Sequence, residues 1–528
     1  MTSRGILELG FGLLFAILVG VLAASPATSF AARAPTKILR VRTLGDPLTL
    51  DWNRAYSPVE SILIRNLMEG LVAIGPKMTV VPATASRWEI SKDGKTYTFH
   101  LRKDVRWSDG VPLKARHFVD SWHRLLEPSF NGNYAYLLDG VEGARDFHDG
   151  KLKEFASVGV KALDDLTLRV QLTLPIAYWI WIPTFWSTFP IREDLIGKLG
   201  TNWDKPGKLV TLGPFLYQSY EPHHNIVLAR NPGYYGVRGN VELVVAALVE
   251  EENAAIGLYD DRQIDFITRL AVETRKLKNR PDFIRWPEAR IMHLDFNPAQ
   301  GLMNDVRVRR AIAMALDRAK LARMLEGASG PASSFVTPGI MGYSRDAGFV
   351  YEPARARELL DKAAERELRS SELELVVAGF NDDVLTANFI ADELKKNLGL
   401  QIKIHKLEPK QFYSPTVTLG GFAMILNRWT ADFPDPDNFF SIFLSKSGNN
   451  RVGWKDPVYD ELVTNARTII NPAKREAAYR AIHKLLVEDN VIAVPLYYGR
   501  NCALIRYGVK GFTPTPTNSY LFKDFSVP

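Results

Sequence analysis

The chain has 528 residues, a formal net charge of +7 at pH 7 and a single cysteine, Cys502. This length is too great for one compact core, so we expect two or three domains. The basic residues are dispersed rather than gathered in a block, which argues against a nucleic-acid partner, and one cysteine excludes an intramolecular disulfide.

The first 31 residues predict a secretory signal peptide. Arg4 precedes an apolar run from Phe11 to Ala24, and Ser29-Phe30-Ala31 offers a cleavage site with small residues at its outer positions. An uncleaved anchor helix is the alternative. No later stretch reaches the apolar length of a membrane span, and no cysteine next to the run offers a site for a lipid anchor. We therefore expect a periplasmic protein.

Short strands and hairpins dominate the first half of the chain. An alternating pattern over Trp88–Leu101, interrupted by Asp93-Gly94, predicts a hairpin. The other elements expected here are a strand at Ile38–Thr43, a loop at Leu50–Ser57, helices at Pro58–Leu71 and Lys114–Leu126, a hairpin at Val158–Leu172 and an aromatic core wedge at Tyr178–Trp186.

Strands and helices alternate in the second half. Leu373–Ala378, Leu385–Leu398 and Ile402–His405 predict a strand, a helix and a strand, hence parallel pairing. We expect the buried strand Phe422–Leu426 to join that sheet. The remaining predictions are strands at Ile226–Ala229, Leu243–Leu248, Ile291–Phe296 and Val491–Tyr498, and helices at Val306–Leu325, Pro457–Arg467 and Pro472–Asp489.

Three acidic residues follow the strand Phe422–Leu426. Asp435 precedes Pro436 and suits a helix N-cap, and Asp437 falls in the first helical turn, where negative charge is favourable. Asp432 is left without such a role. A carboxylate just after Trp429 can hold an organic cation, such as a free amino terminus, by a charge-assisted hydrogen bond and a cation–π contact. An Asx-turn is the alternative.

The sequence contains no recognisable catalytic or metal-binding motif. The adjacent pair His223-His224 has no acidic third ligand at a recognisable spacing, and Cys502 lies on an expected strand, where burial is the simpler interpretation. Asp432 and Asp435 have the chemistry of a glycosidase pair, but capping explains Asp435 better. We therefore predict a binding protein without enzymatic activity, metal or cofactor.

Several short motifs, each present once, follow one another along nearly the whole chain. They are Leu67–Leu71, Trp88–Arg102, Val105–Pro112, Asp204–Gly207 with Gly213, Arg230–Pro232 with Tyr234-Tyr235, Asp305–Ala311 with Asp317-Arg318, Ala431–Pro436 and Trp454–Asp460. Each is weak alone. Together they resemble the extracellular solute-binding proteins of family 5, the oligopeptide- and dipeptide-binding components of ABC importers.

The resemblance implies an α/β fold, a two-lobed periplasmic binding protein of the cluster C type with three domains and a hinge between lobes. Domain I would comprise residues 32–74, 206–290 and 495–528, domain II residues 75–205 and domain III residues 291–494. Ligand would lie between domains I and III, closed by the hinge.

The resemblance also implies the ligand-binding residues. Trp429 and Asp432 match the Trp-x-x-Asp segment in which family members hold a peptide's α-ammonium. Main-chain groups of Arg428 and Thr430 would pair with the peptide as an added strand. The loop Ala55–Ser57, which includes Tyr56, would form the opposite edge, and domain II would contribute Tyr136 or Tyr134.

One departure from the family pattern is Arg428, which stands where small residues are common. Its side chain would contact a ligand carboxylate or, as we favour, point to solvent. No second basic anchor for a peptide's C-terminus is apparent. The family also includes binders of nickel complexes, haem, glutathione, opines and oligosaccharides. We predict a monomeric peptide-binding protein that serves an inner-membrane permease. The alternatives are a non-peptide solute, or a sensor or chaperone outside transport.

Overall fold

The computed structural model describes residues 36–75, 78–130, 132–270, 274–325, 328–363, 372–414 and 419–528. The predicted signal peptide lies outside these residues. Within the described ranges, no helix is both long and apolar enough to cross a membrane.

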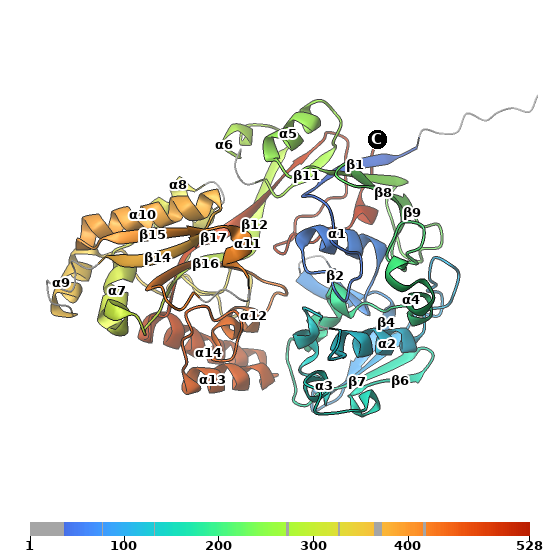
Figure 1. Cartoon of the computed structure of the whole chain (residues 1–528), viewed down its shortest axis with the longest axis horizontal. Helices are drawn as coiled ribbons and strands as arrows, with labels where there is room; N and C mark the ends of the chain where they lie inside the picture. Colours follow the sequence, from blue (N-terminus) through green and yellow to red (C-terminus); the bar gives the residue numbers. More distant parts are fainter. Residues whose placement is uncertain are drawn as a thin grey trace, which may run out of the picture. The chain divides into compact units, whose positions relative to one another are not determined.

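An eleven-stranded sheet has the order β15-β14-β16-β12-β17-β11-β1-β10-β9-β8, with β13 paired to β17 (Figure 1). Its strands are β1 (Ile38–Thr43), β8 (Phe215–Glu221), β9 (Asn225–Arg230), β10 (Leu243–Leu248), β11 (Phe266–Thr268), β12 (Phe283–Phe296), β13 (Ala328–Pro331), β14 (Leu373–Ala378), β15 (Ile402–Leu407), β16 (Met424–Thr430) and β17 (Ala493–Ile505). The long strands β12 and β17 join the β14–β16 half of the sheet to the β1–β11 half.

The predicted domain boundaries at 290/291 and 494/495 fall inside β12 and β17. The chain is predicted to pass between domains I and III at these two points, and at each of them it lies within a continuous paired strand. The boundaries themselves stay a prediction.

The N-terminal hairpins are confirmed. A four-stranded antiparallel sheet has the order β4-β5-β7-β6, and a separate pair joins β2 to β3. Gly94 takes a φ of +70° in the turn between β4 and β5, a conformation that glycine adopts without steric cost. The strands are β2 (Val72–Gly75), β3 (Thr79–Pro82), β4 (Ala85–Ile90), β5 (Thr96–Leu101), β6 (Val160–Asp164) and β7 (Thr167–Gln171).

The expected parallel unit is confirmed as well. β14 pairs in parallel with β15, and α10 (Asn381–Leu398) lies between them in sequence and against both in space (Figure 1). Gly399 ends α10 in the left-handed conformation, with a φ of 74°. β16 pairs in parallel with β14. The strand expected at Phe422–Leu426 therefore joins this sheet, although it spans Met424–Thr430.

Successive residues of β16 face two different hydrophobic cores. Met424 and Leu426 belong to one core with Met292, whereas Ile425 belongs to the other with Ile291. This alternation is the period of two expected for a strand buried on both faces. It fixes which residues of β12 and β16 share a face.

The predicted helix Val306–Leu325 is wrong as one element. The chain forms α7 (Val306–Met314) and α8 (Arg318–Met324). The side chain of Asp317 accepts the Lys320 N–H at 2.8 Å, so this aspartate caps a new helix where the apolar periodicity seemed continuous.

Other predicted helices differ mainly at their ends. α1 (Pro58–Leu67) stops at Met68, which is extended, and α14 (Pro472–His483) continues as a π-helix over Lys484–Asp489. The remaining helices are α2 (Ala115–Leu126), α3 (Ala144–His148), α4 (Glu193–Leu199), α5 (Glu252–Asp260), α6 (Thr274–Leu277), α9 (Pro353–Ala363), α11 (Pro409–Phe412), α12 (Asp437–Phe440) and α13 (Pro457–Thr468).

The end of α1 depends on close approach of Gly213. Its N–H donates to the Leu67 carbonyl at 2.8 Å, and an added Cβ would lie 2.5 Å from the Leu67 carbonyl carbon. We expect Gly213→Ala to lower the free energy of unfolding by about 1–3 kcal/mol through overpacking, measured by urea denaturation.

Gly257→Ala provides a matched control. Gly257 lies inside α5, and nothing stands within 4 Å of an added Cβ, so we expect an unchanged stability or a gain of up to about 1 kcal/mol. Equal stabilities of Gly213→Ala and the wild type would contradict the packing argument.

Candidate ligand-binding site

The segment after β16 is held by the buried side chain of Asn438. Its Oδ1 accepts the indole N–H of Trp429 and the backbone N–H of Asp432, each at 3.0 Å. A side-chain hydrogen bond from Asn438 also reaches the Asp432 carboxylate. Asn438, which is 6% exposed, therefore fixes the two residues of the predicted Trp-x-x-Asp site relative to each other.

The other two acids of the segment are buried and paired. The Asp435 carboxylate receives two hydrogen bonds from Arg475, both of 2.7 Å, and Asp437 Oδ1 receives one from Arg467 Nε at 2.7 Å. Asp435 Oδ1 also accepts the Asp437 N–H at 2.9 Å, but the expected N-cap position is wrong, because Pro436 is the N-cap of α12 and Asp435 stands one residue before it. These ion pairs compensate the charges of Asp435 and Asp437 without any ligand.

Asp432 differs because it forms no ion pair within 4 Å with any described residue. Burial raises the pKa of its carboxyl to about 6, opposed by the Asn438 hydrogen bond and then by the charge of Arg65. Taking a carboxylate out of water is costly without a cation. Asp432 is therefore held in place, and no described cation within 4 Å neutralises its carboxylate.

Arg65 in α1 is the cation whose charge acts on the Asp432 carboxyl. Its Nη1 donates to the Thr184 carbonyl at 3.2 Å, and its guanidinium lies 5.2 Å from the centre of the Trp186 ring. Burial lowers the pKa of Arg65 to about 10, and the charge of Asp432 opposes this. Sequence reasoning missed Arg65, because a cation in the last turn of a helix also suits the helix dipole.

The charge of Asp432 acts on two tyrosines of the predicted domain II. Desolvation, followed by the charge of Asp432, raises the pKa of both Tyr134 and Tyr136. Tyr134 contacts Trp186 edge to face, with 5.4 Å between the ring centres, and Tyr136 is 51% exposed. Arg65, Tyr134, Tyr136 and Asp432 thus converge on one region.

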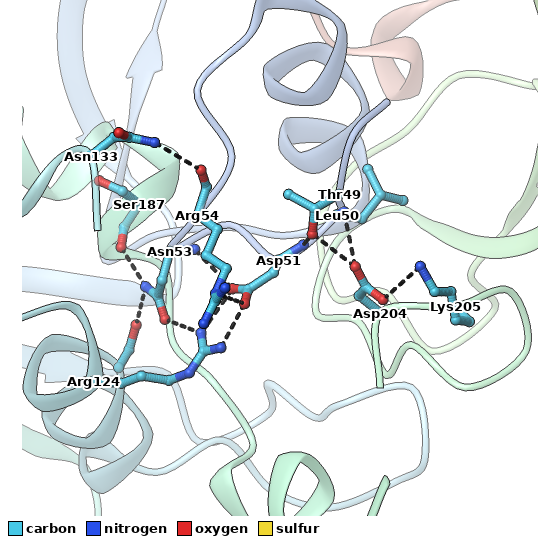
Figure 2. Close-up of polar contacts among 11 residues, drawn as sticks. Thr49, Leu50, Asp51, Asn53, Arg54, Arg124, Asn133, Ser187, Asp204 and Lys205 are labelled. Carbon is cyan, nitrogen blue, oxygen red and sulfur yellow. Dashed lines mark hydrogen bonds and ion pairs between the residues drawn. The ribbon is translucent and has the colours of Figure 1, made fainter. Parts of the chain in front are cut away.

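The loop that precedes α1 is anchored by polar contacts (Figure 2). Asp51 receives two hydrogen bonds from Arg124, at 2.8 and 2.6 Å. The amide of Asn53 donates to the Ser187 carbonyl at 2.8 Å, and Asp204 Oδ2 accepts the Leu50 N–H at 3.2 Å. A rigid base therefore supports Ala55–Ser57.

Tyr56 follows that anchored stretch and is 54% exposed. Its backbone N–H donates to Glu60 Oε2 at 3.0 Å. Within the described ranges, no hydrogen bond, ring contact or charge interaction joins Tyr56 to Asp432. Its predicted contact with ligand therefore stays a prediction.

Backbone groups at the end of β16 face an open edge. Ala431 donates its N–H to the Ala289 carbonyl at 2.8 Å, so alternate residues back to Trp429 face β12. Arg428 and Thr430 therefore direct their backbone groups to the opposite side. On that side the last β14 pairing joins Val377 to Leu426, and the described residues include no strand beyond it.

The expectation that Arg428 points to solvent is wrong. The side chain is 22% exposed and pairs with Asp383 in the first turn of α10. Its guanidinium carbon lies 4.2 Å from the centre of the Phe380 ring. Its position opposite Met292 places it on the α10 side of the sheet.

Cys502 is buried as predicted, donates to the Leu270 carbonyl at 2.8 Å, and has a pKa raised to about 12 by burial. Across the described ranges, no group of three histidine, cysteine, aspartate or glutamate side chains is arranged to hold a metal ion.

Comparison with known proteins gives a consistent result. The family model described as "Bacterial extracellular solute-binding proteins, family 5 Middle" matches residues 79–451. The periplasmic oligopeptide-binding protein OppA of Salmonella typhimurium is 31% identical over 525 residues, or 94% of each chain. The probable deoxycholate-binding periplasmic protein YgiS of Escherichia coli is 30% identical over 501 residues, or 93% of each chain.

Solved structures agree in fold. The unliganded open form of the periplasmic murein tripeptide-binding protein MppA has a TM-score of 0.78 and 27% identity, covering 94% of this chain and 98% of that chain. The complex of Haemophilus influenzae OppA with RPPGFSPFR has a TM-score of 0.77 and 26% identity, covering 93% and 99%. The expected α/β periplasmic binding protein fold is confirmed.

The raised pKa of Asp432 predicts a pH-dependent cost to stability. An acid whose pKa is about 6 when folded, against about 3.9 when unfolded, destabilises the folded state increasingly as pH rises through that interval. We expect Asp432→Asn, relative to the ligand-free wild type, to gain up to about 3 kcal/mol of unfolding free energy between pH 4 and pH 7.

Urea denaturation at several pH values measures this difference. Asp146→Asn is the control, because that carboxylate is 63% exposed on α3, and its stability difference from the wild type should barely change with pH. Parallel pH profiles for Asp432→Asn and the wild type would contradict the burial argument.

Proposed function

Because the chain belongs to the bacterial extracellular solute-binding proteins of family 5, we propose that it captures peptides in the periplasm, with Asp432 holding the free amino terminus. The peptide would then pass to the permease of an ABC importer in the inner membrane. The protein acts as a monomeric binding protein and carries out no catalytic step.

The observation that carries this proposal is the isolated carboxylate of Asp432. Asn438 holds it beside the Trp429 indole, with no cation within 4 Å among the described residues. An α-ammonium at this place would supply the missing charge through hydrogen bonds of the strong, charge-assisted kind. The indole and the two tyrosines would shield that ion pair from water and strengthen it.

The open edge of β16 supports a peptide over a smaller amine. Backbone groups of Arg428 and Thr430 have no strand partner on the side away from β12, and the Arg428 N–H donates to Asn427 Oδ1 at 2.8 Å, a bond that a peptide carbonyl would have to replace. An extended peptide starting at Asp432 can add there as a strand, and backbone pairing of this kind is indifferent to the side chains of the ligand. Tyr136 and Tyr56, both about half exposed, would then contact those side chains.

The relatives are named for two kinds of ligand, and the second kind is the alternative to a peptide. OppA and MppA are named for peptides, whereas YgiS is named for deoxycholate, which has a carboxylate and no ammonium. Such a ligand would place an anion near Asp432, which lacks a neutralising partner. The site therefore favours the peptide over the steroid acid, and over a sensor or chaperone role without a defined ligand.

Binding of a free-amino peptide should depend on Asp432. We expect the mature protein to bind Ala-Ala-Ala and not its N-acetylated form, and Asp432→Asn to lose at least about 30-fold in affinity, as for removal of one partner of a buried charge pair. Isothermal titration calorimetry after unfolding and refolding, which strips any ligand carried over, measures this.

Asp146→Asn serves as the control and should bind like the wild type. Equal affinity for free and acetylated peptide, or unchanged binding by Asp432→Asn, would refute the assignment of Asp432. Binding of deoxycholate in place of peptide would move the conclusion to a non-peptide solute.

The same contact predicts how affinity depends on pH. Ammonium binding requires ionised Asp432, whose pKa is about 6, while a peptide amino terminus stays protonated below about pH 7.7. We expect affinity to fall by about tenfold for each pH unit below 6. In Asp432→Asn the remaining weak binding should be flat between pH 5 and pH 7, and an equally flat wild-type profile would contradict the prediction.

A further inference from the structure

The described part of the chain contains separate hydrophobic cores on the two sides of β12 and β17. One core, with a single exception, takes its residues from the chain up to 286 and from 503 onward, and we call this part the first lobe. Two other cores take their residues from 289–498, the second lobe. Along the chain, the crossings between the lobes lie within β12 and β17. Lobes with separate cores and two connecting strands can tilt relative to each other.

Phe433 is the exception. Among the described residues of the second lobe, it is the only one that belongs to the core of the first lobe, and it is 7% exposed. Ala431, two positions earlier, belongs to a core of the second lobe. The segment that carries Asp432 therefore inserts one aromatic side chain into the other lobe.

Tyr178 of the first lobe receives this side chain. It stands just before the 3-10 helix Trp179–Thr184, and its ring is stacked on that of Phe433, with 5.0 Å between the ring centres and 18° between the planes. Burial, followed by the charge of Asp437, raises the pKa of the Tyr178 phenol, which agrees with a place beside α12. An aromatic pair at this distance stabilises a contact beyond the area that it buries.

Two further contacts between the lobes flank the stack. The Ala177 N–H donates to the Arg467 carbonyl at 3.1 Å, in the last turn of α13, where carbonyl groups lack a partner within the helix. A Cβ added to Gly94, in the turn between β4 and β5, would lie 2.7 Å from Ile470 Cδ1 and 3.1 Å from Pro175 Cβ. The same patch of the first lobe thus contacts the second lobe beside Phe433 and at the end of α13.

These contacts join protein to protein, and the hydrogen bond from the Asp432 N–H to Asn438 lies within the second lobe. Tilting the lobes apart would separate the Tyr178 and Phe433 rings and expose both to water. The stack therefore favours the closed arrangement whichever solute the site holds. When only the closed arrangement binds tightly, the measured affinity rises in proportion to the fraction of molecules that are closed.

We propose that Tyr178 and Phe433 form a clasp between the lobes, which raises the affinity of the site for its ligand without contacting the ligand. Both are positioning residues, because they act through the closed arrangement of the lobes. The part of this inference that concerns affinity rests on the proposed function. The closing effect of the clasp does not depend on the identity of the ligand.

The first test measures the distance between the lobes without ligand. Spin labels on Lys151→Cys and Lys484→Cys, whose lysines are 66% and 60% exposed, report this distance by double electron–electron resonance, and Cys502 is buried. We expect a short and a long distance in the ligand-free protein. Tyr178→Ala should raise the ratio of long to short about 2- to 12-fold, the range of an aromatic pair.

The second test is a double-mutant cycle on the affinity for Ala-Ala-Ala, measured by calorimetry. Tyr178→Ala and Phe433→Ala should each weaken binding about tenfold, and the double variant should also lose about tenfold rather than a hundredfold. If Phe433→Ala does not fold, Phe433→Leu takes its place in the cycle. Tyr178→Phe keeps the ring and should stay within about threefold of the wild type. Tyr507→Ala, at a side chain that is 99% exposed, is the control and should bind like the wild type.

The outcomes separate this inference from the proposed function. Additive losses in the double variant, or unchanged affinity in Tyr178→Ala, would overturn the clasp. Weaker binding by Tyr178→Ala with an unchanged ligand-free distance distribution would place this tyrosine on the ligand and would also overturn it. Failure of every free-amino peptide to bind would overturn the proposed function, and the distance measurement would still decide whether the clasp closes the lobes.

Discussion

The early end of β14 is the constraint on which the site depends. β14 pairs with β16 only as far as Leu426, whereas β16 continues to Thr430. Inside a sheet the backbone groups of Arg428 would be occupied by a neighbouring strand. Because that neighbour leaves the sheet, they lie at an open edge, where the Arg428 N–H donates instead to Asn427 Oδ1 at 2.8 Å. The edge is bounded at one end by the turn into α10 and at the other by Asp432.

The three acids after β16 show how one segment serves both structure and binding. Asp435 and Asp437 are buried against Arg475 and Arg467, which compensate their charges and fix α12. That fixed helix positions Asn438, and Asn438 positions Asp432. Asp432 itself has no such compensation, and its raised pKa reflects the resulting cost. Sites that bind ions commonly hold such destabilised groups, because a partner that compensated the charge beforehand would compete with the ligand.

Sequence reasoning failed once at a local cap and once at a long-range contact. The apolar periodicity of Val306–Leu325 continues through Asp317, yet that aspartate caps a second helix. Arg428 lies beyond the expected strand Phe422–Leu426, but β16 extends to Thr430, and Asp383 of α10 pairs with the arginine. The hairpins and the parallel unit were predictable because turn residues and periodicities act over a few neighbouring residues.

The sequence by itself determined the strands and most helices, the parallel unit around β14, and the chemistry available at Asp432, since a carboxylate a few residues after a buried strand and just after an indole has few roles. Only the tertiary structure decided which of the three acids stays unpaired, that the charge of Arg65 in α1 acts on Asp432, and that Arg428 pairs with Asp383 of α10. Those facts depend on the register of β12 against β16 and on the placement of helices far apart in the chain. Such contacts follow from packing of the whole molecule, which no local spacing of residues encodes.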